Sequence, residues 1–402
     1  MRGLLTYAAA SLLAAPTLAS PLLSTRSGNN QDRCNHDNPF KDVTVYANYR
    51  YSTKLRQTIA AFEAKGDAAG AAGARNSYLR TRKCADIIDR GKIAYLEPQL
   101  LDAKADQAAN WEQRAVPLVI YNLPGRDCAA LASSGEIPLG PNALNIYKTE
   151  YIDPIVAMIR KYGGLRYIIV LEPDSLANLV TNMHIPACAQ AAGIYKAGVA
   201  YAISQLQDKN VAVYLDIGHS NWLGWPANLQ PAAKLFAEVK MWAGQRTNKF
   251  RGFVSNVSGY NAYNSTTADP IYGLGPDNSN WNEWRFFKSF TPYLINNGLP
   301  TKFIVDQGRA GVSGIRSEGA FWCNIDGAGI GTRPTTKTND CNVDAIVWVK
   351  PPGESDGTSD MSSPRFDATC RGPDAFVPSP EAGDWHEEYI EMLIKNANPP
   401  LV

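Results

Sequence analysis

Short runs of consecutive apolar residues alternate along this chain with longer amphipathic segments. A run of four or more apolar residues is typical of a strand buried on both faces, whereas apolar residues at i, i+3 and i+4 predict a helix. The predicted strands cover residues 43–48, 93–96, 117–121, 168–171, 211–215, 252–257, 303–305 and 345–349. The predicted helices cover residues 52–62, 151–162, 188–207, 232–243 and 282–296.

Strands that alternate with helices predict βα units and a parallel sheet. About eight such units without a linker-like break favour an α/β fold of one domain, a distorted (β/α) barrel with central parallel strands. An open doubly wound sheet is the alternative. That fold usually carries a glycine-rich phosphate turn, and no G-x-G-x-x-G follows a strand here.

The N-terminus has the pattern of a secretory signal. Arg2 is followed by an apolar stretch over residues 4–13, which is too short to span a bilayer, and small residues precede Ala19. We therefore expect a signal peptide over residues 1–19, a leader or propeptide over 20–37 and the folded domain over 38–402. The mature protein is expected to be secreted and extracellular.

Composition narrows the range of partners. The chain has 39 Lys and Arg against 38 Asp and Glu, a net charge of +1, so nothing favours a nucleic acid partner. No later segment is long enough to span a membrane. Seven cysteines in a secreted chain predict disulfides, and the absence of any C-x-x-C pair argues against a zinc site. We expect no metal and no cofactor.

Acidic residues follow several predicted strands at their carboxyl ends. They are Asp174, Asp216, Asp306 and, in the loop after Asn122, Asp127. Carboxylates that meet at one edge of a barrel suit either a hard metal ion or the hydrolysis of a glycoside. Two tryptophans, Trp222 and Trp225, lie in the loop after Asp216 and favour sugar binding.

Asp174 is the residue around which these elements are arranged. Pro173 ends the predicted strand, so Asp174 lies at the edge of an apolar core, where partial desolvation favours a protonated carboxyl. That environment suits a general acid. A helix-capping aspartate has the same local pattern, and these residues alone do not separate the two.

Two longer motifs are more specific. One is V-I-Y-N-L-P-G-R-D-C-A over residues 119–129, and the other is I-V-L-E-P-D-S-L over residues 169–176. The sequence resembles glycoside hydrolase family 6, the inverting β-1,4-glucanases that include fungal cellobiohydrolases. The resemblance continues to residue 357 through four further segments, at 219–228, 306–309, 322–324 and 348–357.

The resemblance implies a distorted barrel whose loops enclose an active-site tunnel or cleft, with a pair of catalytic carboxyls. Asp174 aligns with the general acid, and Asp127 with the carboxylate that supports it and activates water. Inversion requires roughly 6.5–9.5 Å between acid and base. Asp356 aligns with the other proposed base. Arg309 and Lys350 align with cations that would pair with Asp356 and lower its pKa, so Asp127 is favoured as the base.

Other site residues are carried over from the resemblance alone. Tyr121 would press on the distorted sugar, and Ser133 would help to hold the water. The expected substrate-binding residues are Trp222, Trp225, Trp322, Lys350, Glu354, His219, Asn261 and Tyr95, and the supporting residues are Arg126, Arg309 and Asp216. Tyr95 stands where cellobiohydrolases usually carry a tryptophan, and His219 is as consistent with a structural role.

The resemblance also implies two disulfides, Cys128–Cys188 and Cys323–Cys370. Pairing Cys34 with Cys84 would leave Cys341 unpaired. The chain departs from the family at Asn122 and Gly125, where we expect aspartates, and at Ser355, where we expect cysteine.

The implied activity is that of a cellulose 1,4-β-cellobiosidase, which releases cellobiose from the non-reducing ends of cellulose. Residues 128–147 and 350–370 have the length found in members that roof the cleft. An endo-β-1,4-glucanase with a more open cleft is the alternative, favoured by Tyr95 and by the expected lack of a cellulose-binding module. A non-catalytic sugar-binding protein is disfavoured because Asp174 and Asp127 are both present. The expected partner is cellulose or cello-oligosaccharides, and we expect a monomer.

Overall fold

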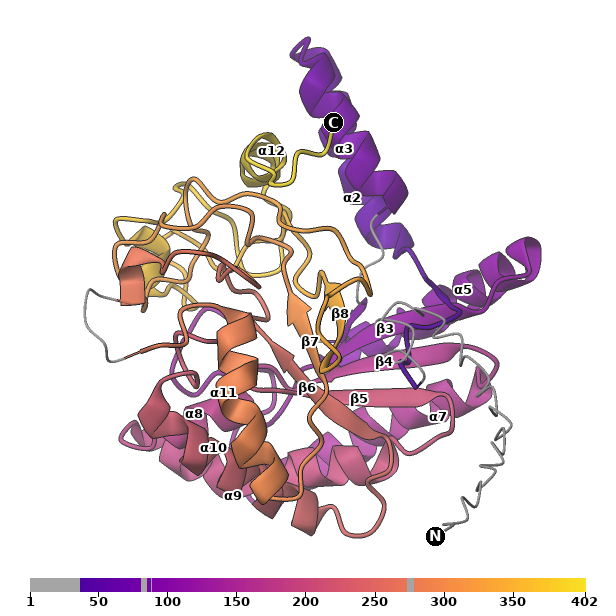
Figure 1. Ribbon diagram of the computed structural model, residues 1–402. Coiled ribbons are helices and arrows are strands. Elements are labelled where there is room, and N and C mark those ends of the chain that lie inside the picture. Colours follow the sequence, from indigo (N-terminus) through magenta and orange to yellow (C-terminus); the bar gives the residue numbers. More distant parts are fainter. Residues whose placement is uncertain (1–36, 81–84, 88, 273–277) are drawn as a thin grey trace, which may run out of the picture.

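The computed structural model describes residues 37–80, 85–87, 89–272 and 278–402, so the predicted signal peptide lies outside the described residues. One curled, fully parallel sheet forms the centre of the molecule (Figure 1). Its strands are β1 (Thr44–Val45), β2 (Ala85–Ile87), β3 (Arg114–Ile120), β4 (Arg166–Leu171), β5 (Val211–Asp216), β6 (Phe250–Ser255), β7 (Phe303–Asp306) and β8 (Val343–Val347). The predicted distorted α/β barrel is confirmed.

The strand order follows the sequence. It runs β1-β3-β4-β5-β6-β7-β8, and β2 pairs with the later part of β3, beyond the part that pairs with β1. Because every pair is parallel, the carboxyl ends of all strands meet at one edge, which is where α/β enzymes place their sites.

Both faces of the sheet are buried, which explains the apolar runs in the sequence. Alternate residues of each strand point to opposite faces. Along β4, Ile168 and Val170 pack inside the barrel, whereas Ile169 and Leu171 pack against the outer helices. The structure gives the outer helices as α5 (Leu96–Asn110), α6 (Ala143–Ile146), α7 (Asp153–Lys161), α8 (Ser175–Thr181), α9 (Pro186–Gln205), α10 (Pro226–Trp242) and α11 (Glu283–Asn296).

The strand predicted over residues 93–96 is wrong. The chain forms α4 (Arg90–Ile93) and then enters α5, and the strand of this region is β2 at Ala85–Ile87. Asp89 caps α4 by accepting a hydrogen bond from the backbone of Lys92. In α5, Leu96, Leu100 and Ala103 are all buried, at the i, i+4, i+7 spacing of one helix face. Tyr95 therefore precedes a helix instead of ending a strand.

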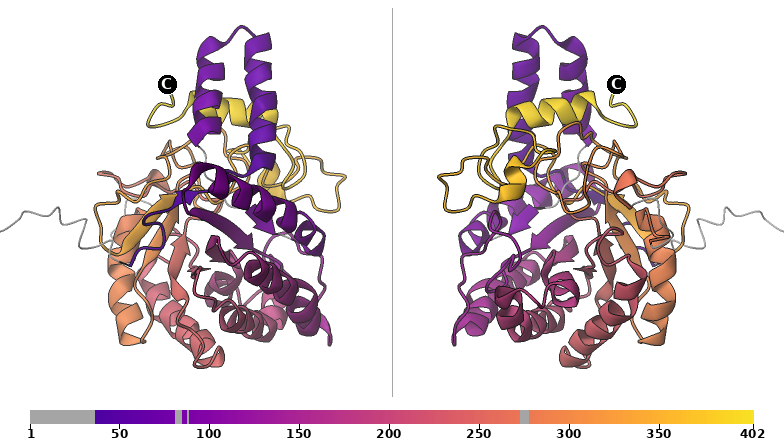
Figure 2. Two further views of the ribbon diagram at one scale, coloured as in Figure 1. Left: turned by 90° about the vertical axis from the view of Figure 1, so that its right-hand side faces the viewer. Right: turned by 90° about the vertical axis from the view of Figure 1, so that its left-hand side faces the viewer.

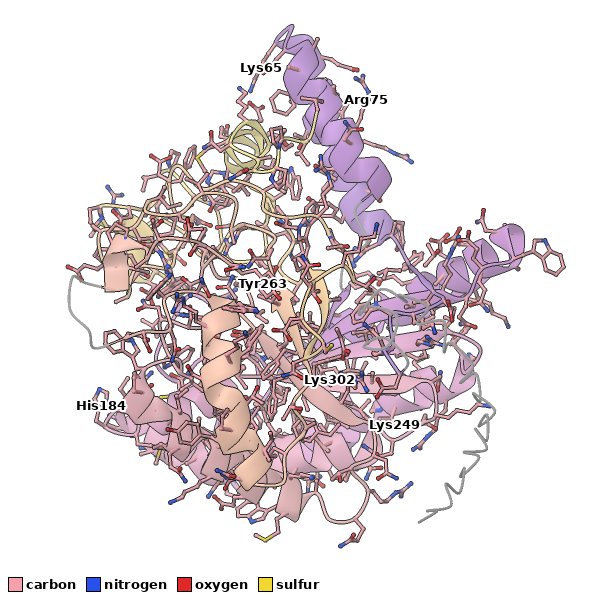
Figure 3. All side chains as sticks on the ribbon, viewed as in Figure 1. Lys65, Arg75, His184, Lys249, Tyr263 and Lys302 are labelled. Carbon is pink, nitrogen blue, oxygen red and sulfur yellow. A yellow bond between two sulfur atoms is a disulfide. The ribbon has the colours of Figure 1, made fainter. Side chains whose placement is uncertain are left out.

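A helical hairpin of α2 (Tyr49–Ala64) and α3 (Ala68–Arg80) projects from the barrel, and α12 (Glu387–Lys395) packs across it (Figure 2). Lys65 lies at the outer end of the hairpin (Figure 3) and pairs with Glu391 of α12. At its base, the Tyr51 hydroxyl donates to the carbonyl of Pro352 at 3.0 Å. The hairpin thus supports the loop that follows β8.

The two disulfides implied by the resemblance are present. Cys128 is bonded to Cys188, and Cys323 to Cys370. The pairing of Cys34 with Cys84 that would leave Cys341 unpaired is wrong, because Cys341 is disulfide-bonded. No second cysteine lies near Cys341 in a C-x-x-C pattern, so the sequence did not indicate its partner. Cys34 and Cys84 lie outside the described residues. Among the helices that the structure describes, none is long and apolar enough to cross a membrane.

Candidate active site

The chain takes left-handed turns where β3 and β4 end. Glu172 has φ of 47°, Asp174 has φ of 62° and Asp127 has φ of 58°. A residue other than glycine rarely adopts positive φ, and such strain is concentrated at functional sites. These turns place the side chains of Asp174 and Asp127 at the carboxyl edge of the sheet.

Asp174 is partly exposed at this edge and directly precedes helix α8. It makes no side-chain capping hydrogen bond to that helix, so the helix-cap interpretation of its carboxyl is wrong. Burial raises the pKa of Asp174 well above its ordinary value, and the charges of Asp216, Asp127 and Asp356 raise it further. This carboxyl is held in its protonated form, which is the state of a general acid.

Asp216 holds the backbone of Asp174 in place. Its Oδ1 atom accepts hydrogen bonds from the backbone N–H of Asp174 at 3.0 Å and of Gly218 at 2.9 Å. Asp216 is buried, and burial raises its pKa to about 7 in spite of these two donors. Asp216 therefore fixes the backbone of the acid and repels a negative charge on its carboxyl.

Asp127 has a different environment. Burial raises its pKa, but the Arg126 charge and hydrogen bonds from the Tyr121 and Ser133 side chains act in the opposite direction. The two donors favour the ionised form of Asp127. The negative charge of Asp127 contributes to the raised pKa of Asp174, so the two carboxyls interact electrostatically. One carboxyl is thus kept protonated while the other is helped to ionise.

Arg126 fixes the position of this loop. Its guanidinium donates to the carbonyls of Tyr121 at 2.6 Å, Ser133 at 2.8 Å and Ser134 at 3.3 Å. It also lies 4.4 Å from the centre of the Tyr121 ring. Arg126 thereby holds the Tyr121 ring and the Ser133 loop, the two groups whose side chains hydrogen-bond to Asp127.

Glu172 is a buried carboxylate that the sequence analysis missed. It accepts hydrogen bonds from the backbone of Asn122 and Leu123 at 3.2 Å and from the Tyr147 hydroxyl at 2.8 Å. Tyr147 begins a short π-helix, η1 (Tyr147–Ile152), and this kind of helix is frequent at functional sites. Glu172 thus connects the strand that carries Asp174 to the loop that carries Asp127.

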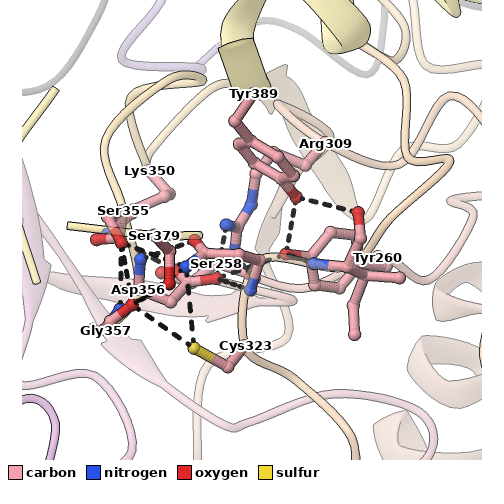
Figure 4. Close-up of polar contacts among 12 residues, drawn as sticks. Ser258, Tyr260, Arg309, Cys323, Lys350, Ser355, Asp356, Gly357, Ser379 and Tyr389 are labelled. Atoms are coloured by element: carbon pink, nitrogen blue, oxygen red, sulfur yellow. Dashed lines mark hydrogen bonds and ion pairs between the residues drawn. The ribbon is translucent and has the colours of Figure 1, made fainter. Parts of the chain in front are cut away.

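Asp356 lies in a cage of donors (Figure 4). Its Oδ2 is 2.6 Å from Arg309 Nη1 and accepts from the backbone of Asn324 at 2.9 Å, and its Oδ1 is 3.5 Å from Lys350 Nζ. Burial alone would raise its pKa, but the charges of Arg309 and Lys350 outweigh burial and lower it. Asp356 is a buried, ion-paired carboxylate, and a poor proton acceptor.

The segments that follow Asp127 and Asp356 contact each other. Arg365 Nη2 donates to the carbonyl of Ala132 at 2.5 Å, and the backbone of Leu131 donates to Asp367 at 3.2 Å. The Cys323–Cys370 disulfide packs against Ala132 in a small apolar cluster. The segments at 128–147 and 350–370 therefore form a closed connection, which we call the roof.

The predicted aromatic platforms lie on loops at the same edge. Trp222 and Trp225 follow β5; their indole N–H groups donate to Thr181 and to the carbonyl of Asn221. Trp322 packs beside the roof disulfide. All three are partly exposed.

Two residues that we expected to contact sugar, Asn261 and His219, contact other residues of the protein. Asn261 is buried; its amide lies 3.1 Å from His219 Nδ1 and donates to Glu283, and its oxygen accepts from Arg316. His219 lies beside Trp222, and burial lowers its pKa to about 3, so its ring is neutral. Asn261 supports His219 from the interior.

Glu354 and Tyr95 also have partners within the chain. Glu354 forms a 3.0 Å ion pair with Lys54 of the hairpin. Tyr95 is exposed, and its ring stacks on Arg50 at 4.1 Å. Tyr95 directly precedes helix α5, and its assignment as a substrate-binding residue rests on the resemblance alone.

Other carboxylates at this edge are structural. Asp306 accepts from the backbone of Ser258, Gly308 and Lys350. Glu283, which the sequence analysis missed because it reads as the first turn of a helix, accepts from the backbone of Ser220 and from Asn261. Their oxygens are used to hold loops, which leaves Asp174 and Asp127 as the candidate reactive pair.

A protonated carboxyl beside a second carboxylate, next to a roof and loop tryptophans, is the arrangement of a glycoside hydrolase. The family model described as Glycosyl hydrolases family 6 matches residues 40–397. The chain belongs to this family.

Curated relatives and solved structures are similar over nearly the whole chain. Exoglucanase 3 of Agaricus bisporus is 45% identical over 90% of this chain and 80% of its own. The 1,4-beta-D-glucan cellobiohydrolase CEL6C of Podospora anserina is 43% identical over 91% and 89%. The structure of cellobiohydrolase II of Humicola insolens, in complex with glucose and cellotetraose, has a TM-score of 0.86 at 41% identity and covers 90% of this chain and 99% of its own.

Proposed function

We propose that this protein hydrolyses β-1,4-glucosidic bonds in cellulose with inversion and releases cellobiose from chain ends, from a secreted, extracellular location. The names of its relatives support the substrate and the product. The observation that carries the chemistry is the unequal pair of carboxyls, with Asp174 held protonated and Asp127 offered donors for its ionised form.

In this proposal Asp174 protonates the leaving glycosidic oxygen. Its raised pKa keeps the proton available, and the departing sugar takes it as the bond breaks. Asp127 accepts a proton from the water that attacks the anomeric carbon on the opposite face, and Ser133 helps to hold that water. Tyr121 presses on the sugar between them, which favours the flattened oxocarbenium-like shape.

Asp356 has a supporting role in this mechanism. Its negative charge raises the pKa of Asp174, and its ion pairs position Lys350 for the substrate hydroxyls. Trp222, Trp225 and Trp322 offer aromatic faces for glucose rings. His219, neutral and partly exposed, is suited to a hydroxyl contact, whereas Asn261 acts through His219.

The roof favours action at chain ends over action within chains. In this proposal the two hydrogen-bonded segments close over the bound substrate, so a long chain does not enter from the side but threads in by its end, and successive cellobiose units leave. An endo-acting enzyme would need this connection to open. The roof is therefore the observation that separates cellobiohydrolase from endoglucanase.

Product analysis on amorphous cellulose tests the proposal. NMR in the first minutes should show α-cellobiose as the main product, and Asp174→Ala should remove it. Early β-cellobiose would contradict the inverting mechanism. A broad range of oligosaccharides with rapidly falling viscosity would instead show endoglucanase action, and binding of cellotetraose without turnover would show a sugar-binding protein.

A further inference from the structure

A hollow of about 490 Å³ lies at the carboxyl edge of the sheet, outside the pair of catalytic carboxyls. It is formed by the connection from β6 to α11 and by the segment after β7. Its lining includes Trp281, hydroxyl-bearing Ser265, Thr266 and Ser313, and the carboxylate residue Asp269. Ligand sites have volumes of about 300–1,000 Å³ and combine aromatic walls with a few polar groups.

The walls of this hollow are fixed by hydrogen bonds. The Asp269 carboxylate accepts from the backbone of Ile271 at 3.2 Å and of Gly314 at 2.8 Å, so it joins the two connections. Asn282 donates to the carbonyl of Ser265 at 3.2 Å. A ligand would enter a preformed site, which lowers the entropic cost of binding.

Trp281 has the features of an aromatic platform for a sugar. Its side chain lines the hollow and is partly exposed. The Arg285 guanidinium stacks on its ring at 3.4 Å and occupies one face. The other face of the indole can then stack a glucose ring.

Trp281 is connected to the loop that carries the predicted platforms. Asn280 donates to the carbonyl of Gly224 at 2.7 Å, directly before Trp225. Asn278 donates to the carbonyl of Ser220 at 3.3 Å. The hollow also shares Asn261 with the group that holds His219. Trp281 thus belongs to the same rim as Trp222 and Trp225.

We propose that Trp281 and this hollow form a distal glucose subsite, which binds a β-1,4-glucan chain where it extends past Trp225. The inference rests on the proposed glucanase function and adds a contact that only long chains reach. Its effect is on the binding of long substrates, because the hollow does not contain the reacting carboxyls.

The test compares kcat/KM on cellotetraose, cellohexaose and amorphous cellulose for the wild type, Trp281→Ala and Trp281→Phe. The control is Trp111→Ala, since the Trp111 indole is 95% exposed at the end of α5 and does not line the hollow. We expect Trp281→Ala to lower kcat/KM about threefold to tenfold on cellohexaose and amorphous cellulose, the loss of one aromatic contact, and to leave kcat/KM on cellotetraose unchanged. Phenylalanine should restore part of the loss, and Trp111→Ala should leave kcat/KM on all three substrates unchanged.

Ser313→Leu provides a second variant that fills the hollow from its exposed opposite rim. It should reproduce the loss on amorphous cellulose even where Trp281→Ala perturbs the fold. Because Asn264-Ser265-Thr266 is a glycosylation sequon at the same hollow, each protein is assayed before and after removal of N-glycans. A loss in either form supports the subsite.

Three outcomes would overturn the subsite. They are an equal loss on cellotetraose and amorphous cellulose, no loss in Trp281→Ala with or without glycans, and a Ser313→Leu protein with wild-type kinetics. If the wild type cleaves none of the substrates, the proposed function fails separately. Calorimetric binding of cellohexaose to Asp174→Ala, with and without Trp281→Ala, then decides the subsite: weaker binding supports it, and equal binding overturns it.

Discussion

Asp356 and Arg309 form a buried ion pair, with 2.6 Å between Oδ2 and Nη1 and with side chains that are 6% and 1% exposed. The arginine also stacks over Tyr260 at 4.5 Å, and the Tyr260 hydroxyl donates to Asp356 at 3.2 Å. Two positive charges and several donors act on this one carboxylate. A base must gain a proton during the reaction, and this environment opposes that gain.

The first prediction concerns Asp356→Asn. The change leaves the Arg309 charge buried without its partner, which typically costs about 3–5 kcal/mol. We expect the free energy of unfolding, measured with urea, to fall by about this amount. Asp360→Asn is the matched control, because Asp360 lies on the same loop but is exposed, and its carboxylate accepts hydrogen bonds from the backbone and hydroxyl of Ser362. A variant of full stability whose lost activity is restored by azide would instead identify Asp356 as the base.

The second prediction concerns the hydrogen bond from Ser133 to Asp127. Burial raises the pKa of Asp127, and this donor partly offsets the increase, so Ser133→Ala should raise that pKa further. If ionised Asp127 is the base, the acidic limb of the kcat/KM profile moves to higher pH. We also expect kcat to fall about 10- to 100-fold, because the water loses its support. Ser134→Ala is the control, and an unshifted acidic limb in Ser133→Ala would contradict the role of Asp127.

The sheet could be predicted from the sequence because each strand is buried on both faces. An apolar run such as Ile168–Leu171 has little freedom to be anything else once proline follows it. The secondary structure of residues 85–96 was predicted wrongly, because the strand of this region is not a long apolar run. Its strand has only three residues and includes Asp86, whereas the apolar run at residues 93–96, where α4 ends and α5 begins, has the pattern of a strand.

The site could be predicted only in part. The motifs identified Asp174 and Asp127, but no local pattern shows that Glu172 is buried, because its three donors come from residues 122, 123 and 147. The sequence does not predict the left-handed turns at Asp127 and Asp174 either, since aspartate tolerates several backbone conformations. Nor did the sequence show that Asn261 and Glu354 have partners within the protein. Contacts between distant segments decide these points.

The third prediction uses the buried Glu172. Burial raises its pKa from 4.5 to about 7, so the folded protein holds a proton that the unfolded chain releases. The stability from this proton is complete below about pH 4.5 and is lost as the pH rises to about 7. Its slope is at most about 1.4 kcal/mol per pH unit. In Glu172→Gln the fall in stability across this window should be shallower.

Urea unfolding of the wild type and of Glu172→Gln at half-unit pH steps measures this difference. Glu136→Gln is the control. Glu136 is more exposed and its pKa is lowered, because hydrogen bonds from Arg90 and Asn122 outweigh its burial, so it contributes no fall in stability over this range. Parallel curves for the wild type and Glu172→Gln would show that Glu172 has an ordinary pKa.

The fourth prediction concerns the roof. Arg365→Ala removes the hydrogen bond to the carbonyl of Ala132, and it also removes a positive charge that lowers the pKa of Asp127, so the ratio of products is compared and not the rate alone. Such a bond contributes about 1 kcal/mol or more, so the open form should become about fivefold more populated. When the roof is open, a cellulose chain can enter the site from the side. The variant should therefore release more insoluble reducing ends from amorphous cellulose for each soluble cellobiose.

Arg371→Ala tests whether this effect comes from the roof itself. Arg371 directly follows the roof segment at 350–370, but its guanidinium donates to the carbonyl of Ser359. The control should keep the wild-type ratio of soluble to insoluble ends, while Asp367→Ala, which loses the bond to Leu131, should follow Arg365→Ala. If both roof variants keep that ratio and both retain activity, the contact between the two segments does not restrict entry. Chain-end preference would then depend on the aromatic subsites that we propose at Trp322 and Trp222.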